Sequence, residues 1–197
     1  MGFHLLRFVF AVFFLTASAF AAPTVVIDAG HGGHDRGGGP GQRIPEKGYN
    51  LDVAMRLSRI LQAAGYRTVL TRSSDVFISL GRRCEIANSN RGAIFVSIHF
   101  NSAARTGASG IETYSYGSRT GASLAASIHR EVLRSTGAVD RGVRQRRYYV
   151  LRNSRIPAVL AELGFLTNPS EASRIVSSSY RQKLAEAVAR GITSKYH

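Results

Sequence analysis

A short apolar segment followed at once by a glycine-rich turn constrains this chain more than any other feature. Residues 24–27 are apolar or β-branched, which is typical of a short buried strand. Residues 28–35 contain three glycines, two histidines and two aspartates. Glycine permits positive φ and lets the backbone approach a ligand closely. Open α/β sheets present functional groups in such turns at their carboxyl edge, so further strands that end in the same way would bring their polar residues to the same place.

The first 21 residues are typical of a secretory signal peptide. A positive charge within residues 1–7 precedes an apolar run, residues 8–20, that is too short to span a bilayer comfortably. Small residues follow at the spacing that a signal peptidase needs. We therefore expect cleavage near Ala22, export to a periplasm or out of the cell, and a mature domain of residues 22–197 without a transmembrane span. An uncleaved anchor is the alternative, which the small residues disfavour.

Length and cysteine usage indicate one domain stabilised by its core. A chain of 197 residues suits a single domain of this kind. Cys84 is the only cysteine, so no intramolecular disulfide can form. Because Cys84 falls within a predicted helix, we interpret it as a small buried apolar residue.

The charge balance indicates the partners in general terms. Lys and Arg total 26 against 12 Asp and Glu, giving a formal net charge of +14. Such a charge favours polyanions, and for an exported chain the anionic cell-envelope surfaces fit this description. No motif typical of nucleic-acid recognition is present, so we expect no nucleic-acid partner. We expect a monomer.

Strand-like and helix-like segments alternate along the rest of the chain, with residues 139–147 left unassigned. The alternation predicts a single α/β domain with a mostly parallel or mixed central sheet and helices on both faces. The predicted strands are 24–27, 66–71, 93–98, 111–116, 148–151 and 158–163, and the predicted helices are 46–64, 79–88, 123–134, one beginning at Asn168-Pro169, and 180–196.

Polar side chains follow three of the predicted strands. His31 comes after the first strand, His99 after the third, and Glu162 at the end of a late one, while Glu46 begins the first helix. Parallel strands would bring these groups to one sheet edge. Two imidazoles and one carboxylate match a catalytic zinc site with an open fourth position. The other carboxylate could then accept a proton from water and pass it to a leaving nitrogen.

Five motifs occur in order and together carry a specific resemblance. They are 27–33 with Asp35; Glu46-Lys47 with Asn50-Leu51; 70–72 with Asp75, Leu80, Arg83 and 86–88; 97–101; and 157–168. With these motifs the chain resembles, from residue 25 to residue 196, the zinc-dependent N-acetylmuramoyl-L-alanine amidases of the amidase 3 catalytic-domain family.

The resemblance implies a ligand set and a reaction. His31, Glu46 and His99 match the family's Zn²⁺ ligands, and Glu162 matches its catalytic glutamate. The implied reaction is hydrolysis of the peptidoglycan amide between the lactyl group of N-acetylmuramic acid and the L-alanine of the stem peptide. The division-associated members carry a long insertion with a plugging helix between the second histidine and the catalytic glutamate. That interval is short here, so we expect an open site without an obligatory activator.

Three further residues are interpreted as structural. Asp28 is expected to hold the turn or orient a ligand of the metal. Arg72 and Arg83 are expected to form ion pairs, with Asp75 or Glu85 as the candidate partners.

Two other functions compete with the amidase hypothesis. The same ligand set could serve a zinc peptidase acting on free peptides, and assays on intact sacculi against isolated muropeptides would separate the two. A non-catalytic polyanion-binding module would bind no zinc and would keep its function after Glu162→Ala. The presence of both Glu46 and Glu162 disfavours the binding module.

Overall fold

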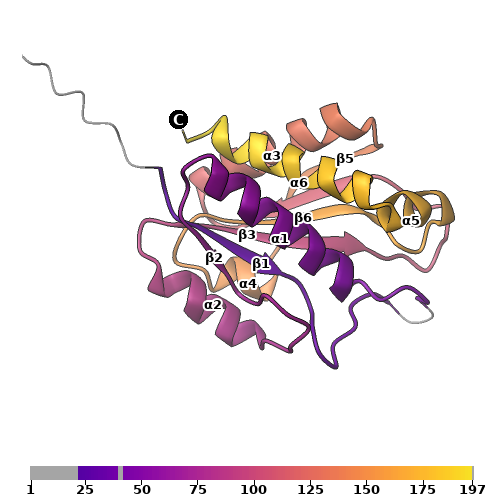
Figure 1. Ribbon diagram of the computed structural model, residues 1–197, viewed down its shortest axis with the longest axis horizontal. Coiled ribbons are helices and arrows are strands. Elements are labelled where there is room, and N and C mark those ends of the chain that lie inside the picture. The colour runs from indigo at the N-terminus through magenta and orange to yellow at the C-terminus, as the bar shows by residue number, and fades with distance from the viewer. Residues whose placement is uncertain (1–21, 40–41, 197) are drawn as a thin grey trace, which may run out of the picture.

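A single sheet with strand order β2-β1-β3-β6-β4-β5 runs through the part of the chain described by this computed structural model, residues 22–39 and 42–196 (Figure 1). The predicted signal peptide lies outside the described residues. The strands are β1 (Val25–Ala29), β2 (Thr68–Leu70), β3 (Ile94–Asn101), β4 (Ile111–Ser115), β5 (Asp140–Gln145) and β6 (Ala158–Phe165). The helices are α1 (Lys47–Ala63), α2 (Leu80–Ser89), α3 (Arg119–Thr136), α4 (Tyr149–Arg152), α5 (Pro169–Val176) and α6 (Ser178–Thr193).

The sheet is mixed, and its parallel part positions the site. Strands β2, β1, β3 and β6 run parallel to one another, whereas β4 is antiparallel to β6 and parallel to β5. The carboxyl ends of β1, β3 and β6 therefore meet at one edge of the sheet. The predicted α/β fold with a parallel or mixed sheet is confirmed.

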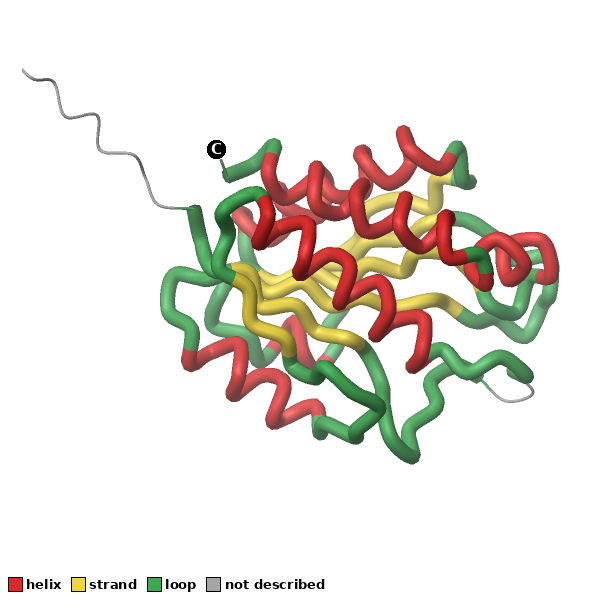
Figure 2. The backbone as a smooth tube through the Cα atoms, in the orientation of Figure 1, coloured by secondary structure: helices red, strands yellow, loops and turns green. Residues whose placement is uncertain are grey.

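Helices cover both faces of the sheet. Helices α1, α3 and α6 lie on one face, and α2 and α4 lie on the other (Figures 1 and 2). The larger apolar core lies under α1, α3 and α6, and a smaller one lies under α2 and α4. A Cβ at Gly191 of α6 would stand 2.5 Å from the Cα of Ile128, so glycine is what allows α3 and α6 to pack this closely.

The predicted elements were wrong in one segment and incomplete in another. Residues 148–151 were predicted as a strand, but residues 149–152 form helix α4. The prediction failed because two adjacent apolar residues in so short a segment are compatible with either a strand or a helix. The unassigned residues 139–147 contain β5. This strand lies at the sheet edge and is largely exposed, so it lacks the buried alternation that marks a strand.

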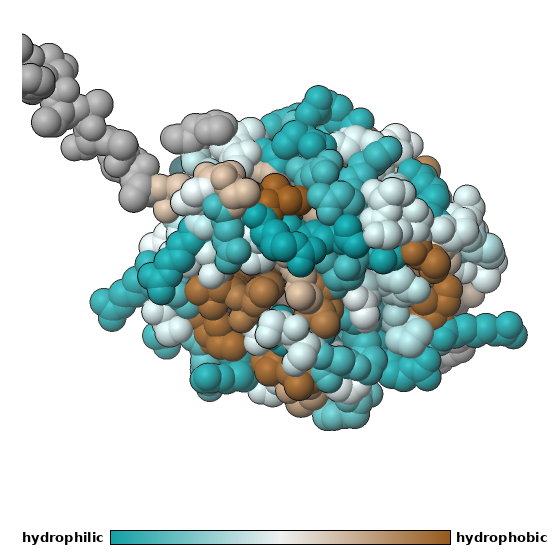
Figure 3. Space-filling view, in the orientation of Figure 1, coloured by the Kyte–Doolittle hydropathy of each residue, from teal (hydrophilic) through white to brown (hydrophobic). Residues whose placement is uncertain are grey.

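The visible surface is mostly hydrophilic. Figure 3 shows apolar residues gathered between α1 and α2, where the three-residue strand β2 forms the other sheet edge. A short edge strand offers few free backbone groups to another chain. Among the described residues, no helix combines the length and apolar character needed to cross a membrane.

Candidate metal and catalytic site

The glycine-rich turn after β1 presents His31 in an unusual backbone conformation. Its φ is +61°, a left-handed value that no other non-glycine residue of the described chain adopts. The backbones of Gly32 and Asp35 bond to each other in both directions, at 2.9 and 3.1 Å. This folds the turn back so that Asp35 Oδ2 lies 2.8 Å from His31 Nδ1. The carboxylate therefore orients the imidazole and leaves Nε2 available.

Glu46 lies buried at the start of α1, between the two histidines. Its side chain caps no backbone N–H of the helix, which removes the ordinary explanation for a glutamate at this position. Oε1 accepts hydrogen bonds from Asn50 Nδ2 at 2.9 Å and from the Phe100 amide at 3.0 Å. Oε2 lies 3.3 Å from His31 Nε2, and Oε1 lies 2.9 Å from His99 Nδ1.

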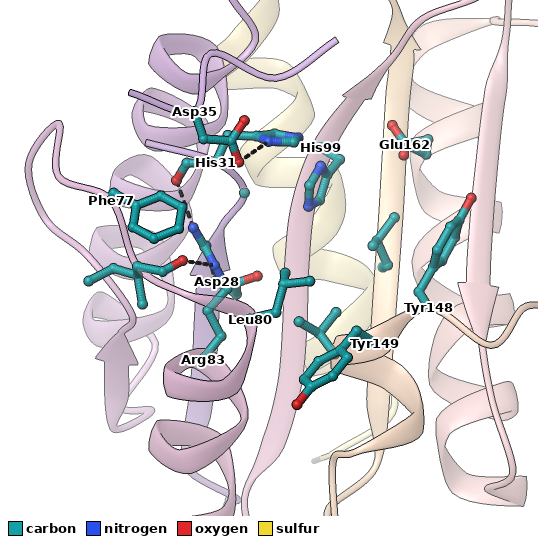
Figure 4. Close-up of a pocket in the computed structure, with 14 residues that line it drawn as sticks. Asp28, His31, Asp35, Phe77, Leu80, Arg83, His99, Tyr148, Tyr149 and Glu162 are labelled. Carbon is teal, nitrogen blue, oxygen red and sulfur yellow. Dashed lines mark hydrogen bonds and ion pairs between the residues drawn. The ribbon is translucent and has the colours of Figure 1, made fainter. Parts of the chain in front are cut away.

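His99 completes the cluster from within β3, which continues to Asn101, rather than from after the strand as predicted. Its ring is packed over the backbone of Gly30. A Cβ at Gly30 would lie 2.3 Å from His99 Cε1, so only glycine leaves room for this ring. The rings of His31 and His99 meet edge to face, with their centroids 4.9 Å apart (Figure 4). The second histidine is thus positioned by the turn that carries the first.

These three side chains fit a metal ion. His31, Glu46 and His99 each offer one ligand atom, and the three atoms lie within 4.8 Å of one another. Burial favours the neutral ring of His31, but hydrogen bonds and charges from Glu46 and Asp35 outweigh it and raise its pKa to about 9. Burial likewise opposes the charge of Glu46, yet the two histidines lower its pKa. A divalent cation binding here would displace protons from the imidazoles.

Glu162 stands on β6 as the direct neighbour of His99 in the β3–β6 ladder. It lies within the strand rather than at its end as predicted, because β6 continues to Phe165 past a register shift. Its Oε2 is shielded from solvent and has no hydrogen-bond partner among the described residues. Burial raises the pKa of Glu162 to about 7; His99 opposes this rise, and the carboxylates of Glu46 and Glu112 reinforce it. Such a carboxylate can both accept and donate a proton near neutral pH.

A buried ion pair between Asp28 and Arg83 supports the turn after β1, and Asp28 is not the partner that was predicted for Arg83. Arg83 Nη1 lies 2.6 Å from Asp28 Oδ1, while Nη2 donates to the carbonyl of His31 at 2.8 Å. Both side chains are almost completely buried. The expected partners bond elsewhere: Asp75 pairs with Lys47, and Glu85 pairs with Arg82.

Arg72 forms hydrogen bonds rather than the predicted ion pair. Its guanidinium donates to the carbonyls of Ala29 at 2.9 Å, Gly30 at 2.8 Å and Lys47 at 2.8 Å. It thereby ties the turn after β1 to the start of α1, the two segments that carry His31 and Glu46.

A second buried carboxylate beside the site was missed by the sequence interpretation. Glu112 on β4 accepts hydrogen bonds from Asn101 Nδ2 at 2.9 Å, from Arg141 Nε at 2.7 Å and from the Tyr114 hydroxyl. It is the cross-strand partner of Glu162. An acidic residue inside a predicted strand was the available signal, because a buried carboxylate is costly unless it is paired.

Comparisons with known proteins agree on one family. The family model described as N-acetylmuramoyl-L-alanine amidase matches residues 25–194. The chain is 42% identical over 183 residues to the uncharacterised protein YqiI of Bacillus subtilis (strain 168), covering 91% of this chain and 88% of that protein. It is 39% identical over 176 residues to the N-acetylmuramoyl-L-alanine amidase LytC of the same strain, covering 88% of this chain but only 35% of LytC.

A solved structure gives the same result. The catalytic domain of CwlV, an N-acetylmuramoyl-L-alanine amidase from Bacillus (Paenibacillus) polymyxa var. colistinus, matches with a TM-score of 0.82 at 37% identity. The match covers 87% of this chain and 97% of that domain. Sequence and fold therefore lead to one conclusion: the chain belongs to the N-acetylmuramoyl-L-alanine amidase family.

Proposed function

We propose that this protein is a zinc-dependent amidase that hydrolyses the bond between N-acetylmuramic acid and the L-alanine of the peptidoglycan stem peptide. The observation that carries the proposal is the meeting of His31, Glu46 and His99, from three distant segments, with Glu162 on the strand next to His99. Family membership supplies the substrate class.

In this proposal His31, Glu46 and His99 hold the ion, and Glu162 moves protons. Imidazole and carboxylate donors suit Zn²⁺, and three protein ligands are typical of its catalytic sites. When bound, zinc supplies a Lewis acid that polarises the amide carbonyl and acidifies water. Glu162 takes a proton from the attacking water and delivers it to the leaving nitrogen of L-alanine. Asp35 and Asn50 keep His31 and Glu46 in place.

Metal analysis combined with turnover of purified peptidoglycan tests these roles. Glu162→Gln should keep stoichiometric zinc and lose about 10²–10⁴-fold in turnover, the usual effect of removing a general base. Glu186→Gln, at an exposed position of α6, is the matched control and should behave as wild type. A Glu162→Gln protein with full turnover would contradict the role of Glu162.

A comparison of substrates separates the amidase from the zinc peptidase considered above. The amidase cleaves intact sacculi and releases stem peptides with a free L-alanine amino group. A peptidase would instead cut isolated stem peptides that carry no sugar. A protein without zinc and without either activity would leave only the polyanion-binding module.

Export and mature boundaries are part of the proposal. We expect removal of residues 1–21 and a functional domain of residues 22–197, because the cell-wall substrate lies outside the cytoplasm. The N-terminal sequence of protein recovered from outside the cytoplasm checks this, with Ala22 or a close neighbour as the expected first residue.

The site is expected to work without an activator protein. Phe77 and Tyr149 at the edge of the adjoining pocket are each more than two-fifths exposed, which supports free access for substrate. Turnover by the purified monomer with no partner present is the expected result. Strict dependence on a second protein would contradict it.

One segment combines several basic residues, which favour anionic envelope surfaces, with no opposing charge. Residues 141–161 contain six arginines and no acidic residue. Arg141 forms an ion pair with Glu112, and the other five arginines are exposed. Such a segment attracts anionic surfaces by charge, with an affinity that falls as salt rises.

Binding to vesicles of anionic phospholipid tests this segment as the contact. Removing three of its charges should weaken binding clearly more than removing three charges elsewhere, and high salt should release the wild type. The test variant combines Arg144→Gln, Arg146→Gln and Arg147→Gln, and the control combines Arg59→Gln, Arg91→Gln and Lys183→Gln. Equal weakening in both would indicate that net charge alone acts.

A further inference from the structure

A pocket of about 310 Å³ adjoins the metal and catalytic residues on the face of the sheet that α2 and α4 cover. His31, His99 and Glu162 line one end of it, and Figure 4 shows them along the upper side of the cavity. Its volume lies near the lower end of the range for small-molecule sites, about 300–1,000 Å³. A group bound there would stand directly beside the reacting amide.

Large apolar side chains stand exposed around this pocket. Phe77 is 45% exposed and Leu80 52% on one side, while Tyr148 is 40% and Tyr149 43% exposed on the other (Figure 4). Aromatic rings exposed at a cavity offer flat apolar faces and, for tyrosine, a polar edge. Exposed apolar side chains gathered at one cavity indicate a ligand surface.

Both walls are held in place by contacts outside the pocket. Asp75 accepts from the Gly33 amide at 2.8 Å and pairs with Lys47, which fixes the segment that carries Phe77. The ring of His34 lies against that of Phe77, with centroids 4.2 Å apart.

The opposite wall is tied to α2. Asn88 of α2 donates to the carbonyl of Asn153 at 3.0 Å and accepts from the Arg155 amide at 2.6 Å. The Asn153 side chain in turn donates to the Tyr149 carbonyl at 2.8 Å. The two walls are therefore preorganised rather than formed by loose loops.

The cationic side chains that line the pocket are already engaged. Arg83 is the only Lys or Arg in the lining and pairs with Asp28, while His31 and His99 are the proposed metal ligands. The stem peptide carries free carboxylates, and the pocket offers these groups no free arginine or lysine. The N-acetylmuramoyl half is uncharged, because its only carboxyl group is consumed in the amide to be cleaved.

We propose that this pocket binds the N-acetylated sugar of the substrate, with its ring against Tyr149 and Phe77, and that the stem peptide leaves the site on the other side of Glu162. The inference rests on the proposed amidase function and specifies how its substrate is oriented. It predicts that binding of the sugar, and not binding of the peptide, depends on Phe77 and Tyr149.

The test uses two substrates with the same lactyl–L-alanine amide, one with the N-acetylmuramic acid ring and one without any sugar. Wild-type protein should cleave the sugar-bearing substrate with the higher kcat/KM. Tyr149→Ala and Phe77→Ala should each lower kcat/KM for that substrate at least about tenfold, the order expected for one lost aromatic contact of 1.4 kcal/mol. Neither change should lower kcat/KM for the sugar-free substrate. Tyr149→Phe keeps the ring and should lose less than Tyr149→Ala. Val176→Ala, at an exposed apolar position outside the pocket, is the control and should stay near wild type.

A binding experiment separates this inference from the proposed function. The Glu162→Gln protein, loaded with zinc, is titrated with a peptide-free disaccharide of N-acetylglucosamine and N-acetylmuramic acid whose lactyl carboxyl group is capped as a methyl amide, and binding is followed by calorimetry. Saturable binding that is weakened by Tyr149→Ala or Phe77→Ala supports the sugar site, even if the wild-type protein hydrolyses neither substrate. The absence of hydrolysis would contradict only the proposed amidase function. Equal losses on both substrates, or disaccharide binding unaffected by both alanine variants, would overturn the sugar assignment while leaving the amidase intact. Circular dichroism of each variant identifies any that fails to fold, and the other alanine variant then decides.

Discussion

Glu112 and Glu162 face each other directly across the β4–β6 ladder, yet only one of the two carboxylates is compensated by a cation. Glu112 accepts from Arg141 Nε at 2.7 Å, whereas Oε2 of Glu162 has no partner within the described residues. Burial opposes the charge of Glu112, but hydrogen bonds from Tyr114 and Arg141 outweigh it and lower its pKa. One strand pair thus holds a fixed charge beside a carboxylate that is free to exchange protons.

Glu112→Gln tests this fixed charge through stability. Because the folded pKa of Glu112 lies below the unfolded value, its charge stabilises the fold above about pH 4.3, and this contribution is lost as pH falls through the folded pKa. The variant should lose about 1–3 kcal/mol at pH 7, measured by urea unfolding. The difference from wild type should shrink at pH 3.5. Glu85→Gln, at an exposed ion pair, should change stability by less than about 0.5 kcal/mol. A loss of stability in Glu112→Gln that is the same at pH 7 and at pH 3.5 would show that the charge of Glu112 is not its source.

Gly30→Ala should disrupt the proposed metal site while the rest of the fold persists. The new Cβ would stand 2.3 Å from two atoms of the His99 ring, so the ring must leave the position in which it contacts Glu46. We expect zinc affinity to fall at least about tenfold, which corresponds to 1.4 kcal/mol. Zinc titration of the purified variant measures this.

Gly81→Ala is the control for that change, because nothing lies within 4 Å of a Cβ at Gly81. Alanine is favoured over glycine in a helix by about 1 kcal/mol, so this variant should be somewhat more stable and keep its zinc affinity. Unchanged zinc binding in Gly30→Ala would show that the ring can move without consequence.

Arg83→Met should destabilise the domain strongly. It leaves the buried carboxylate of Asp28 without its cation, a loss of about 3–5 kcal/mol in comparable cases. Denaturant unfolding measures the difference. Arg82→Met removes only an exposed ion pair on the same helix and should cost less than about 0.5 kcal/mol. Similar losses in the two variants would mean that the Asp28–Arg83 pair is not the source.

Metal removal should abolish turnover, and zinc should restore it. In the metal-free protein the pKa of His31 is raised to about 9, so protons compete with the metal at every lower pH. Zinc affinity should therefore weaken steadily from pH 9 to pH 6, as measured by competition with a chromophoric chelator. The melting temperature should rise with zinc concentration, because only the folded state presents the three ligands. An affinity independent of pH would argue against imidazole ligands.

The sequence alone determined the class of fold and the residues that the proposed site uses. Strand-like segments followed by polar turns predicted an α/β sheet with functional groups at one edge, and the motifs around His31, His99 and Glu162 carried the family resemblance. These signals are local, since each depends on the order of neighbouring residues. The edge strand β5 was not predicted because it lacks the alternation of buried and exposed residues. The four-residue helix α4 was not predicted because it is too short to show a helical period.

Only the tertiary structure decided which groups meet. The Asp28–Arg83 pair, the Glu112–Arg141 pair and the pocket between Phe77 and Tyr149 join residues that lie far apart in the chain. Sequence spacing carries no information about such pairs, because packing of the sheet and helices sets their distances. Arg83 shows this most clearly: its position suggested Asp75 or Glu85 as the partner, and the fold instead placed it beside a carboxylate 55 residues away.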